Sequence, residues 1–323
     1  IKTDGTLWLW RKQGGLGGGN NGGLRDNTTT NRSSPVQTVT GGNNWSKVSV
    51  GFSYSAAIKT DGTLWLWGRN SYGQIGDNTT IHRSSPVQTI AGGNNWNFVA
   101  CGNYQTAAIK TDGTLWVWGR NNAGQLGDNT TTNRSSPVQT IATGNNWTKI
   151  SCSKDQTAAI KSDGTLWLWG SNGNGELGDN TVISKSSPIQ TITRGTNWSQ
   201  VTCGNQYTAA TKTDGTLWLW GLNAGGKLGD NTTTSKSSPI QTTTFGNKWS
   251  IVGTGYYSTL AIYENTPSAL SIATQPVNAY TGQKLLNQPV VSIVDSSGAI
   301  VQTPPIVVTV ALASGSPTLT GNT

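Results

Sequence analysis

The chain has 323 residues, of which 33% are hydrophobic, only 11% are charged and 15 are Trp. The low charge excludes a disordered polyelectrolyte, and so many Trp residues indicate a packed interior. The net charge of +8 is spread along the chain without a Lys/Arg run, which favours a solvated surface over a nucleic-acid site. No apolar run approaches the roughly 18–20 residues that a membrane-spanning helix needs.

The chain is built from repeats of 51 residues. A DGTLW string recurs in every unit, and an SSP string follows it at a constant spacing of 51 between units. The DGTLW strings begin at Asp4, Asp61, Asp112, Asp163 and Asp214, and the SSP strings carry Pro35, Pro86, Pro137, Pro188 and Pro239. Five units are therefore present, and six additional residues enlarge a Gly-rich loop between Trp10 and Pro35 in the first of them.

Each unit predicts four short strands, which the second unit illustrates in chain order. The segments 43–51 and 54–60 come first, and the Asp-Gly pair after them is a strong signal for a two-residue hairpin turn. The segment 63–67 alternates with period two, as a strand does, and the long polar connection 76–90 ends in the last short strand. Four strands in every repeat predict an all-β fold, a β-propeller with one 51-residue unit per blade.

Recurring motifs carry a family resemblance across residues 1–263. They are a V-x-x-G strand, an AAIKTDGTLWxWG core, a GQ(L/I)GD turn and the SPV that follows. With these motifs the chain resembles the regulator-of-chromosome-condensation repeat family, which implies a β-propeller, most often of seven blades. The family usually has a His after the Gly of the V-x-x-G strand. The residues at that position here are Tyr54, Gln105, Gln156, Tyr207 and Ser258. We carry over the fold and not the chromatin or GTPase-exchange roles of the eukaryotic founder.

The repeat region starts and stops at the same phase. Ile1 aligns with Ile58 of the AAIKTDGT string, and Ile262 aligns with that same residue. We therefore expect the hairpin 1–10 to complete the blade that 249–262 begins, so that N- and C-terminal strands close the ring and leave no exposed edge. The phase predicts a whole number of blades, without deciding between five and seven.

Trp and Cys both recur at fixed positions. Three Trp residues occur on the strands of every unit, which favours packing between blades over a sugar-binding platform. Cys101, Cys152 and Cys203 share one position in three successive units, where Val50 and Thr254 stand in the other two. This pattern predicts a packing site near the central channel with three free, unreactive thiols, because neighbouring blades should hold the Cα atoms beyond the roughly 7 Å limit for a disulfide.

Catalytic motifs are absent from the sequence. The single His, His82, stands in a variable loop without a recurring acid or nucleophile partner. The Gly-rich loop lacks the Lys-Ser/Thr of a phosphate loop, and one Asp in each repeat loop is too few for a calcium cage. We predict that the protein is not an enzyme and that it holds no cofactor and no metal ion.

The repeat also predicts two charged rings. A basic ring precedes SSP and is the expected contact for an acidic partner: Arg32, Arg83, Arg134, Lys185 and Lys236. An acidic ring opens the DNTT-type loops: Asp26, Asp77, Asp128, Asp179 and Asp230. In the alternative interpretation the rings screen each other and each Asp caps its own loop. The units differ most in the loops 69–72, 120–123, 171–174 and 222–225, where we expect a partner to bind.

Nine N-x-S/T sequons suit glycan attachment in an exported protein, although repetition multiplies them. They begin at Asn27, Asn31, Asn44, Asn78, Asn129, Asn133, Asn146, Asn197 and Asn231.

The repeat stops after Ile262. Residues 264–269 predict a linker, and 270–323 resemble part of the immunoglobulin-like modules of bacterial surface proteins, especially in QPVVSIVDSSG. Such a sandwich usually takes about 100 residues and seven strands, so the segment predicts a partial domain. Its remaining strands come either from further along the chain or from a neighbouring subunit.

Together these features predict a modular, non-catalytic protein at the cell surface or outside the cell, with a rigid propeller used for binding or assembly. Strand donation to the partial C-terminal domain would join copies into a head-to-tail filament. The alternative is a soluble propeller that binds a single protein partner, as an inhibitor does. The expected partner is a protein or a second copy, with glycans attached, and not a nucleic acid or a membrane.

Overall fold

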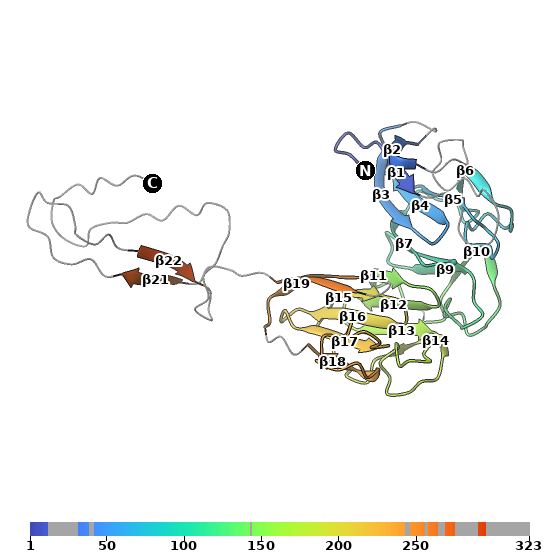
Figure 1. Ribbon diagram of the computed structural model, residues 1–323. Coiled ribbons are helices and arrows are strands. Elements are labelled where there is room, and N and C mark those ends of the chain that lie inside the picture. The colour runs from blue at the N-terminus through green and yellow to red at the C-terminus, as the bar shows by residue number, and fades with distance from the viewer. Residues whose placement is uncertain are drawn as a thin grey trace, which may run out of the picture. The chain divides into compact units, whose positions relative to one another are not determined.

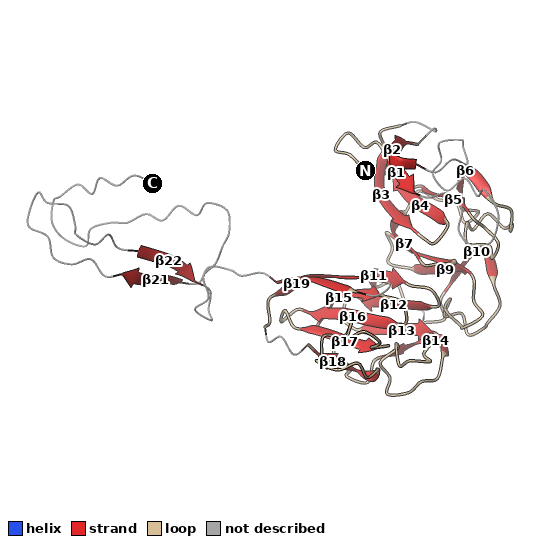
Figure 2. Ribbon diagram, in the orientation of Figure 1, coloured by secondary structure: helices blue, strands red, loops and turns tan. Residues whose placement is uncertain are grey.

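The protein divides into two compact units, Ile1–Tyr263 and Glu264–Thr323. The computed structural model describes residues 1–11, 32–38, 42–142, 144–242, 246–255, 258–263, 269–274 and 290–294. Every regular element in these residues is a β-strand (Figure 2). The predicted all-β class is therefore confirmed for the described part of the chain.

Four antiparallel, four-stranded sheets form the body of the first unit (Figure 1). The first contains β3 (Trp45–Val50), β4 (Tyr54–Lys59), β5 (Leu64–Gly68) and β6 (Arg83–Gln88). The second contains β7 (Trp96–Cys101), β8 (Gln105–Lys110), β9 (Leu115–Gly119) and β10 (Arg134–Gln139). The third contains β11 (Trp147–Cys152), β12 (Gln156–Lys161), β13 (Leu166–Gly170) and β14 (Lys185–Gln190). The fourth contains β15 (Trp198–Cys203), β16 (Tyr207–Lys212), β17 (Leu217–Gly221) and β18 (Lys236–Gln241).

The Asp-Gly pair forms the hairpin between the second and third strands of each sheet, as predicted. In the first sheet Gly62 has a φ of 80°, and a Cβ there would collide with the carbonyl of Asn94 in the next connection. The Asp61 carboxylate caps this turn because its Oδ1 accepts hydrogen bonds from Thr63 N (2.9 Å) and Thr63 Oγ1 (2.6 Å). Only Gly meets both demands of this position, the left-handed backbone and the close approach.

The hydrophobic core lies between consecutive sheets rather than within one sheet. One cluster joins Tyr54 and Leu66 of the first sheet to Val99 and Trp118 of the second. The Trp118 indole is fully buried, and its Nε1 donates a 2.9 Å hydrogen bond to the carbonyl of Gln74 in the preceding sheet. The same arrangement repeats with Trp169 and Trp220, so the prediction that the Trp residues pack blade against blade is confirmed for these positions.

Buried Tyr and Gln residues stand where the family usually has His, and they connect the sheets. Tyr54 Oη donates to the carbonyl of Gln105 (2.5 Å) in the second sheet. Gln105 Nε2 in turn donates to the carbonyl of Ser153 (3.0 Å) in the third. A buried polar side chain that reaches the next backbone satisfies a carbonyl that would otherwise lose its solvent, so these residues serve the fold.

The predicted closure of the ring is wrong for this structure. β1 (Trp8–Arg11) pairs with β2 (Arg32–Gln37), and β19 (Trp249–Thr254) pairs with β20 (Thr259–Tyr263), in two separate sheets. These half-blades lie at opposite ends of the row of sheets (Figure 1). Trp10 is 58% exposed as a result, whereas its counterparts in the four complete sheets are all 0% exposed.

The physical reason for this error is the rotation between neighbouring sheets. Nearly identical contacts recur at every interface between sheets, so each interface adds nearly the same rotation. The phase of the repeat counts blades but carries no information about that angle. Over these sheets the accumulated rotation leaves the half-blades apart (Figure 1).

In the second unit, the described residues form one antiparallel pair, β21 (Ala269–Thr274) and β22 (Val290–Val294). Ala269, the last residue of the predicted linker, already belongs to β21. The rest of the predicted linker and of the immunoglobulin-like segment lies outside the described residues.

Candidate functional site

The long connections between the third and fourth strands lie at the same end of the sheets as the turns between the first and second strands. We call this end the loop face, formed by residues 51–53 and 69–82 in the first sheet and by their counterparts in the other sheets. The opposite end carries the Asp-Gly turns and the connections between sheets.

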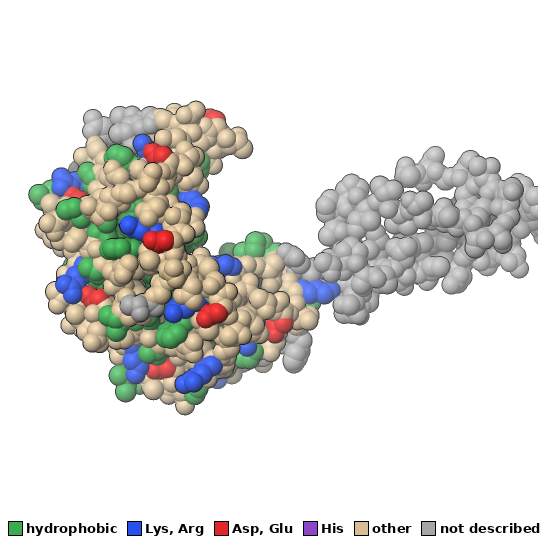
Figure 3. All heavy atoms as spheres, turned by 180° about the vertical axis from the view of Figure 1, so that it is seen from behind, with side chains coloured by type: hydrophobic (Ala, Val, Ile, Leu, Met, Phe, Trp, Pro, Cys, Tyr) green, Lys and Arg blue, Asp and Glu red, His purple; other side chains and the backbone are tan. Residues whose placement is uncertain are grey.

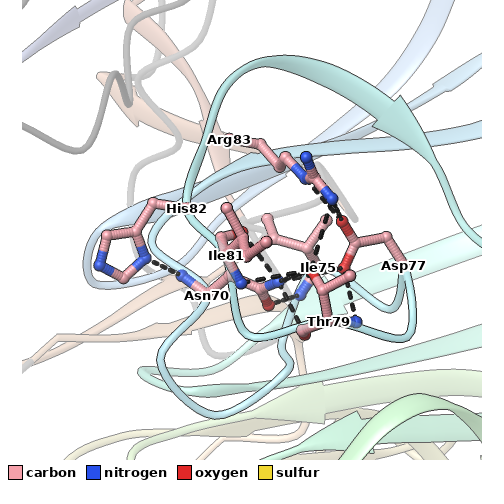
Figure 4. A network of polar contacts seen from close by, with 7 residues as sticks. All are labelled: Asn70, Ile75, Asp77, Thr79, Ile81, His82 and Arg83. Atoms are coloured by element: carbon pink, nitrogen blue, oxygen red, sulfur yellow. Dashed lines mark hydrogen bonds and ion pairs between the residues drawn. The ribbon is translucent and has the colours of Figure 1, made fainter.

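Each connection on the loop face is held by a network around one buried Asn (Figure 4). Asn70 Nδ2 donates to Asp77 Oδ1 (3.1 Å) and to the carbonyls of Thr79 (3.0 Å) and Ile81 (3.1 Å). Asn70 Oδ1 accepts a hydrogen bond from Ile75 N (2.8 Å). The network fixes the loop from inside without a metal ion, and no group of three or more His, Cys, Asp or Glu side chains in the described residues could hold one.

The predicted charged rings are paired with each other in the four complete sheets. Arg83 lies 2.5 Å from Asp77, and Arg134 lies 2.8 Å from Asp128. The corresponding pairs Lys185–Asp179 and Lys236–Asp230 measure 3.6 and 3.4 Å. The structure thus has the geometry of the alternative interpretation, mutual screening, while Asp26 and the side chain of Arg32 lie outside the described residues.

These contacts also explain the electrostatics of the acidic ring. Burial acts to raise the pKa of Asp77, but hydrogen bonds from Thr79 and Arg83 outweigh burial and lower it. The same balance lowers the pKa of Asp128. Each Asp is therefore a charged loop cap and not a proton donor near neutral pH.

His82 belongs to the same loop frame. Its Nδ1 accepts a 2.9 Å hydrogen bond from Asn70 N (Figure 4). In the second sheet, Asn133 Oδ1 accepts the equivalent bond from Asn121 N (2.8 Å), and Ser residues do so in the third and fourth. Burial lowers the pKa of His82, so the neutral ring that accepts this bond is favoured. Because Asn or Ser accepts the equivalent backbone hydrogen bond in the other sheets, we assign His82 a structural role.

A cavity of about 300 Å³ lies on the loop face, where the first strands of the sheets end. Cys101, Cys152 and Cys203 line it, and all three thiols are free, as predicted. Burial raises the pKa of both Cys101 and Cys203 to about 12, so neither thiol forms a nucleophilic thiolate near neutral pH. Phe52 and Lys154, which are equivalent residues of different blades, lie at the rim of the cavity.

An aromatic and arginine cluster adjoins this cavity at the seam between the first two sheets. The ring of Tyr104 packs edge-to-face with Phe52 at 5.9 Å and with Tyr72 at 5.2 Å between centroids. The guanidinium carbons of Arg69 and Arg120 lie 5.4 and 5.5 Å from the centroid of the same Tyr104 ring. We call these five residues the seam cluster.

The backbone positions the seam cluster. Arg120 N donates to the carbonyl of Tyr104 (2.9 Å), and Arg69 N donates to the carbonyl of Ser53 (2.8 Å). The variable loops 69–72 and 120–123 were predicted to contact a partner, and they contribute three of the five cluster residues. Sequence reasoning missed Phe52 and Tyr104 because neither aromatic residue recurs in the next unit. Phe52 gives way to Asn103 and then Lys154, and Tyr104 gives way to Asp155.

The sequons have mixed positions. Asn78, Asn129 and Asn231 are exposed loop residues with φ between 59° and 61°, whereas Asn133 accepts the loop-frame hydrogen bond described above. Asn44, Asn146 and Asn197 are half-buried. Asn27 and Asn31 lie outside the described residues. No helix in the described part of the chain has the length and hydropathy to span a membrane.

The chain is similar in sequence to proteins of animals and plants. The chain is 31% identical over 212 residues to the probable E3 ubiquitin-protein ligase HERC4 of Mus musculus, a match that covers 64% of this chain and 20% of HERC4. It is 31% identical over 195 residues to the ultraviolet-B receptor UVR8 of Arabidopsis thaliana, covering 59% of this chain and 44% of UVR8. The chain thus spans a minor part of either relative.

A solved structure and a family model agree with the fold. Prp20p of Saccharomyces cerevisiae superposes with a TM-score of 0.67 at 18% identity, covering 80% of this chain and 64% of Prp20p. The family model of the RCC1-like domain matches residues 1–269. With its 51-residue units of four antiparallel strands, this chain belongs to the RCC1-like domain family.

Proposed function

We propose that the propeller unit is a non-catalytic scaffold that binds a protein partner through its loop face. The seam cluster is the observation that carries this proposal. Tyr and Arg are among the residue types that contribute most to binding at protein interfaces. The Tyr and Arg residues of the seam cluster are held in place by backbone hydrogen bonds and by stacking before a partner binds. Phe52 is 46% exposed, which leaves apolar surface for a partner at the rim of the cavity.

The titratable groups of the loop face support a role in binding rather than catalysis. His82 accepts a backbone hydrogen bond, and burial raises the pKa of the Cys101 thiol. Each described Asp of the acidic ring holds its own loop and pairs with a cation. A catalytic site needs a nucleophile, acid or base that is free to meet a substrate.

The binding role predicted for the basic ring stays a prediction. Arg83 and Arg134 already face a carboxylate within their own loops, so a partner would have to compete for them. The seam cluster is the stronger candidate because Arg69 has no carboxylate partner among the described residues. An extracellular location is part of our proposal and rests on the exposed sequons at Asn78 and Asn129.

Self-assembly is a second candidate, and the exposed edge of the last half-blade favours it. β20 pairs only with β19 among the described strands, and its Leu260 and Ile262 are 77% and 52% exposed. An apolar strand edge pairs readily with another strand. Sedimentation velocity over a wide concentration range tests this candidate, since a monomer at every concentration would exclude it.

Site-specific photo-crosslinking tests binding through the loop face. A photoreactive amino acid replaces Asn122, exposed on the loop face, or Thr111, exposed in an Asp-Gly turn at the opposite end. We expect the Asn122 probe to capture a protein from the native source and the Thr111 probe to capture none. Equal capture by both probes, or capture by neither, would refute the proposal.

A further inference from the structure

The seam cluster has more cationic groups than carboxylates in contact with them. Arg69 and Arg120 both stack on Tyr104, so two guanidinium groups share one ring. Asp155 pairs with only one of them, because its Oδ1 lies 3.3 Å from Arg120 Nη1 and also accepts a hydrogen bond from Gln125 Nε2 (3.2 Å). Arg69 Nε donates a hydrogen bond to the hydroxyl oxygen of Ser71 (3.1 Å).

Neighbouring groups add to this excess. Lys154 is exposed at the rim of the adjacent cavity and has no ion pair among the described residues. The ring cations of the four complete sheets are each matched by an Asp, so their charge is largely cancelled. On the side drawn in Figure 3, basic and acidic side chains are dispersed over the propeller unit and form no continuous basic stripe. Beside the cavity, Arg69 and Lys154 are therefore loop-face cations without a carboxylate partner among the described residues.

We propose that the seam cluster binds an acidic segment of the partner protein, an inference that rests on the proposed function. Carboxylates of that segment meet the guanidinium groups of Arg69 and Arg120. An apolar side chain next to them covers Phe52 at the mouth of the cavity. Stacking on Tyr104 restrains both guanidinium groups in advance, so binding loses less side-chain entropy than it would with mobile arginines.

The compact size of the site favours a peptide over a nucleic acid. Binding to a nucleic-acid backbone needs cations spaced along a groove, because each phosphate contact adds to affinity. Here the two guanidinium groups of the seam cluster share one aromatic ring, beside a cavity of about 300 Å³.

Fluorescence anisotropy with synthetic peptides tests the inference on the full chain. The probe is a labelled peptide of Glu residues around one central Phe, and the reference is the same peptide with Gln in place of every Glu. We expect the Glu peptide to bind with an affinity that falls as salt rises, and the Gln peptide to bind more weakly. Equal binding of the two peptides would overturn the inference.

Two matched variants separate the seam from the overall charge. Arg69→Gln removes a stacked cation, whereas Arg194→Gln removes an exposed cation at the opposite end of the sheets. We expect Arg69→Gln to weaken the Glu peptide by about tenfold or more, the range for a charge-assisted hydrogen bond, and Arg194→Gln to change little. Equal losses of affinity in the two variants would show that the peptide responds only to the net charge of the protein. Binding of a single-stranded oligonucleotide at the seam more tightly than the Glu peptide would favour a nucleic acid. Either result overturns the inference.

The two proposals fail in different ways. If the Asn122 probe captures a protein whose affinity is the same for Arg69→Gln and the unaltered chain, the proposed function stands and the acidic segment is refuted. If the Glu peptide binds at the seam but the Asn122 probe captures no protein, the proposed function fails. Unchanged circular dichroism and melting temperature of the variants show that each has folded.

Discussion

Replacing the buried Asn of one loop should destabilise the propeller unit substantially. Asn121 is fully buried, and its Nδ2 donates to Asp128 Oδ1 (3.0 Å) and to the carbonyl of Thr130 (3.0 Å). Its Oδ1 accepts a hydrogen bond from Leu126 N (2.9 Å). Asn121→Ala removes three hydrogen bonds, each worth about 1 kcal/mol, and strands a buried N–H, for a loss of about 3 to 5 kcal/mol.

The neighbouring residue provides the control. Asn122 is exposed and makes no hydrogen bond among the described residues, so Asn122→Ala should change stability by less than about 0.5 kcal/mol. Urea unfolding followed by Trp fluorescence measures both variants, and an unchanged slope with denaturant shows that the same surface unfolds. A loss below about 1 kcal/mol for Asn121→Ala would mean that water replaces the side chain and that the loop frame is not a stabilising device.

Further predictions concern the packing, the thiols and the acidic ring. Gly127→Ala should lower the melting temperature in calorimetry, because its φ is 65° and a Cβ would meet the next blade's indole Nε1 at 2.8 Å. Cys101 should resist a thiol reagent at pH 8 in the native protein and react after unfolding, because burial raises its pKa to about 12. Asp128 has a lowered pKa, since hydrogen bonds from Thr130 and Arg134 outweigh burial. The ionised Asp128 therefore stabilises the fold fully above its unfolded pKa, and this stabilisation is lost as the pH falls through its folded pKa. Urea unfolding should show Asp128→Asn less stable than the unaltered chain at pH 7, with a smaller difference in the free energy of unfolding below about pH 4.

The sequence predicted the repeated parts of the fold well because every unit offers the same signal again. The predicted strand 54–60 corresponds to β4 (Tyr54–Lys59), and the Asp-Gly turn lies where expected. Recurrence also led to the correct expectation of three unpaired Cys. Such features depend on local backbone preferences and on periodic burial, which a sequence records directly.

Features that depend on geometry between blades escaped the sequence. Closure failed because the rotation at each interface is set by side-chain packing and not by the phase of the repeat. The sequence left open whether the basic ring binds a partner or the two rings screen each other, because Arg83 lies six residues after Asp77 across a loop whose path only the structure reveals. The seam cluster was missed because Phe52 and Tyr104 occupy different positions of the repeat, and neither aromatic residue recurs in the next unit.

The loop frame also separates the residues that hold each loop from the residues that it displays. Asn70 and Asp77 recur in every complete sheet, whereas Tyr72 gives way to Ala123 and then to other residues at the displayed position. Exposed substitutions there leave the internal hydrogen bonds intact, so the displayed residues can vary without loss of stability. One backbone can therefore present a combinatorial set of surfaces, and libraries confined to these tips should yield binders of different selectivity from a single scaffold.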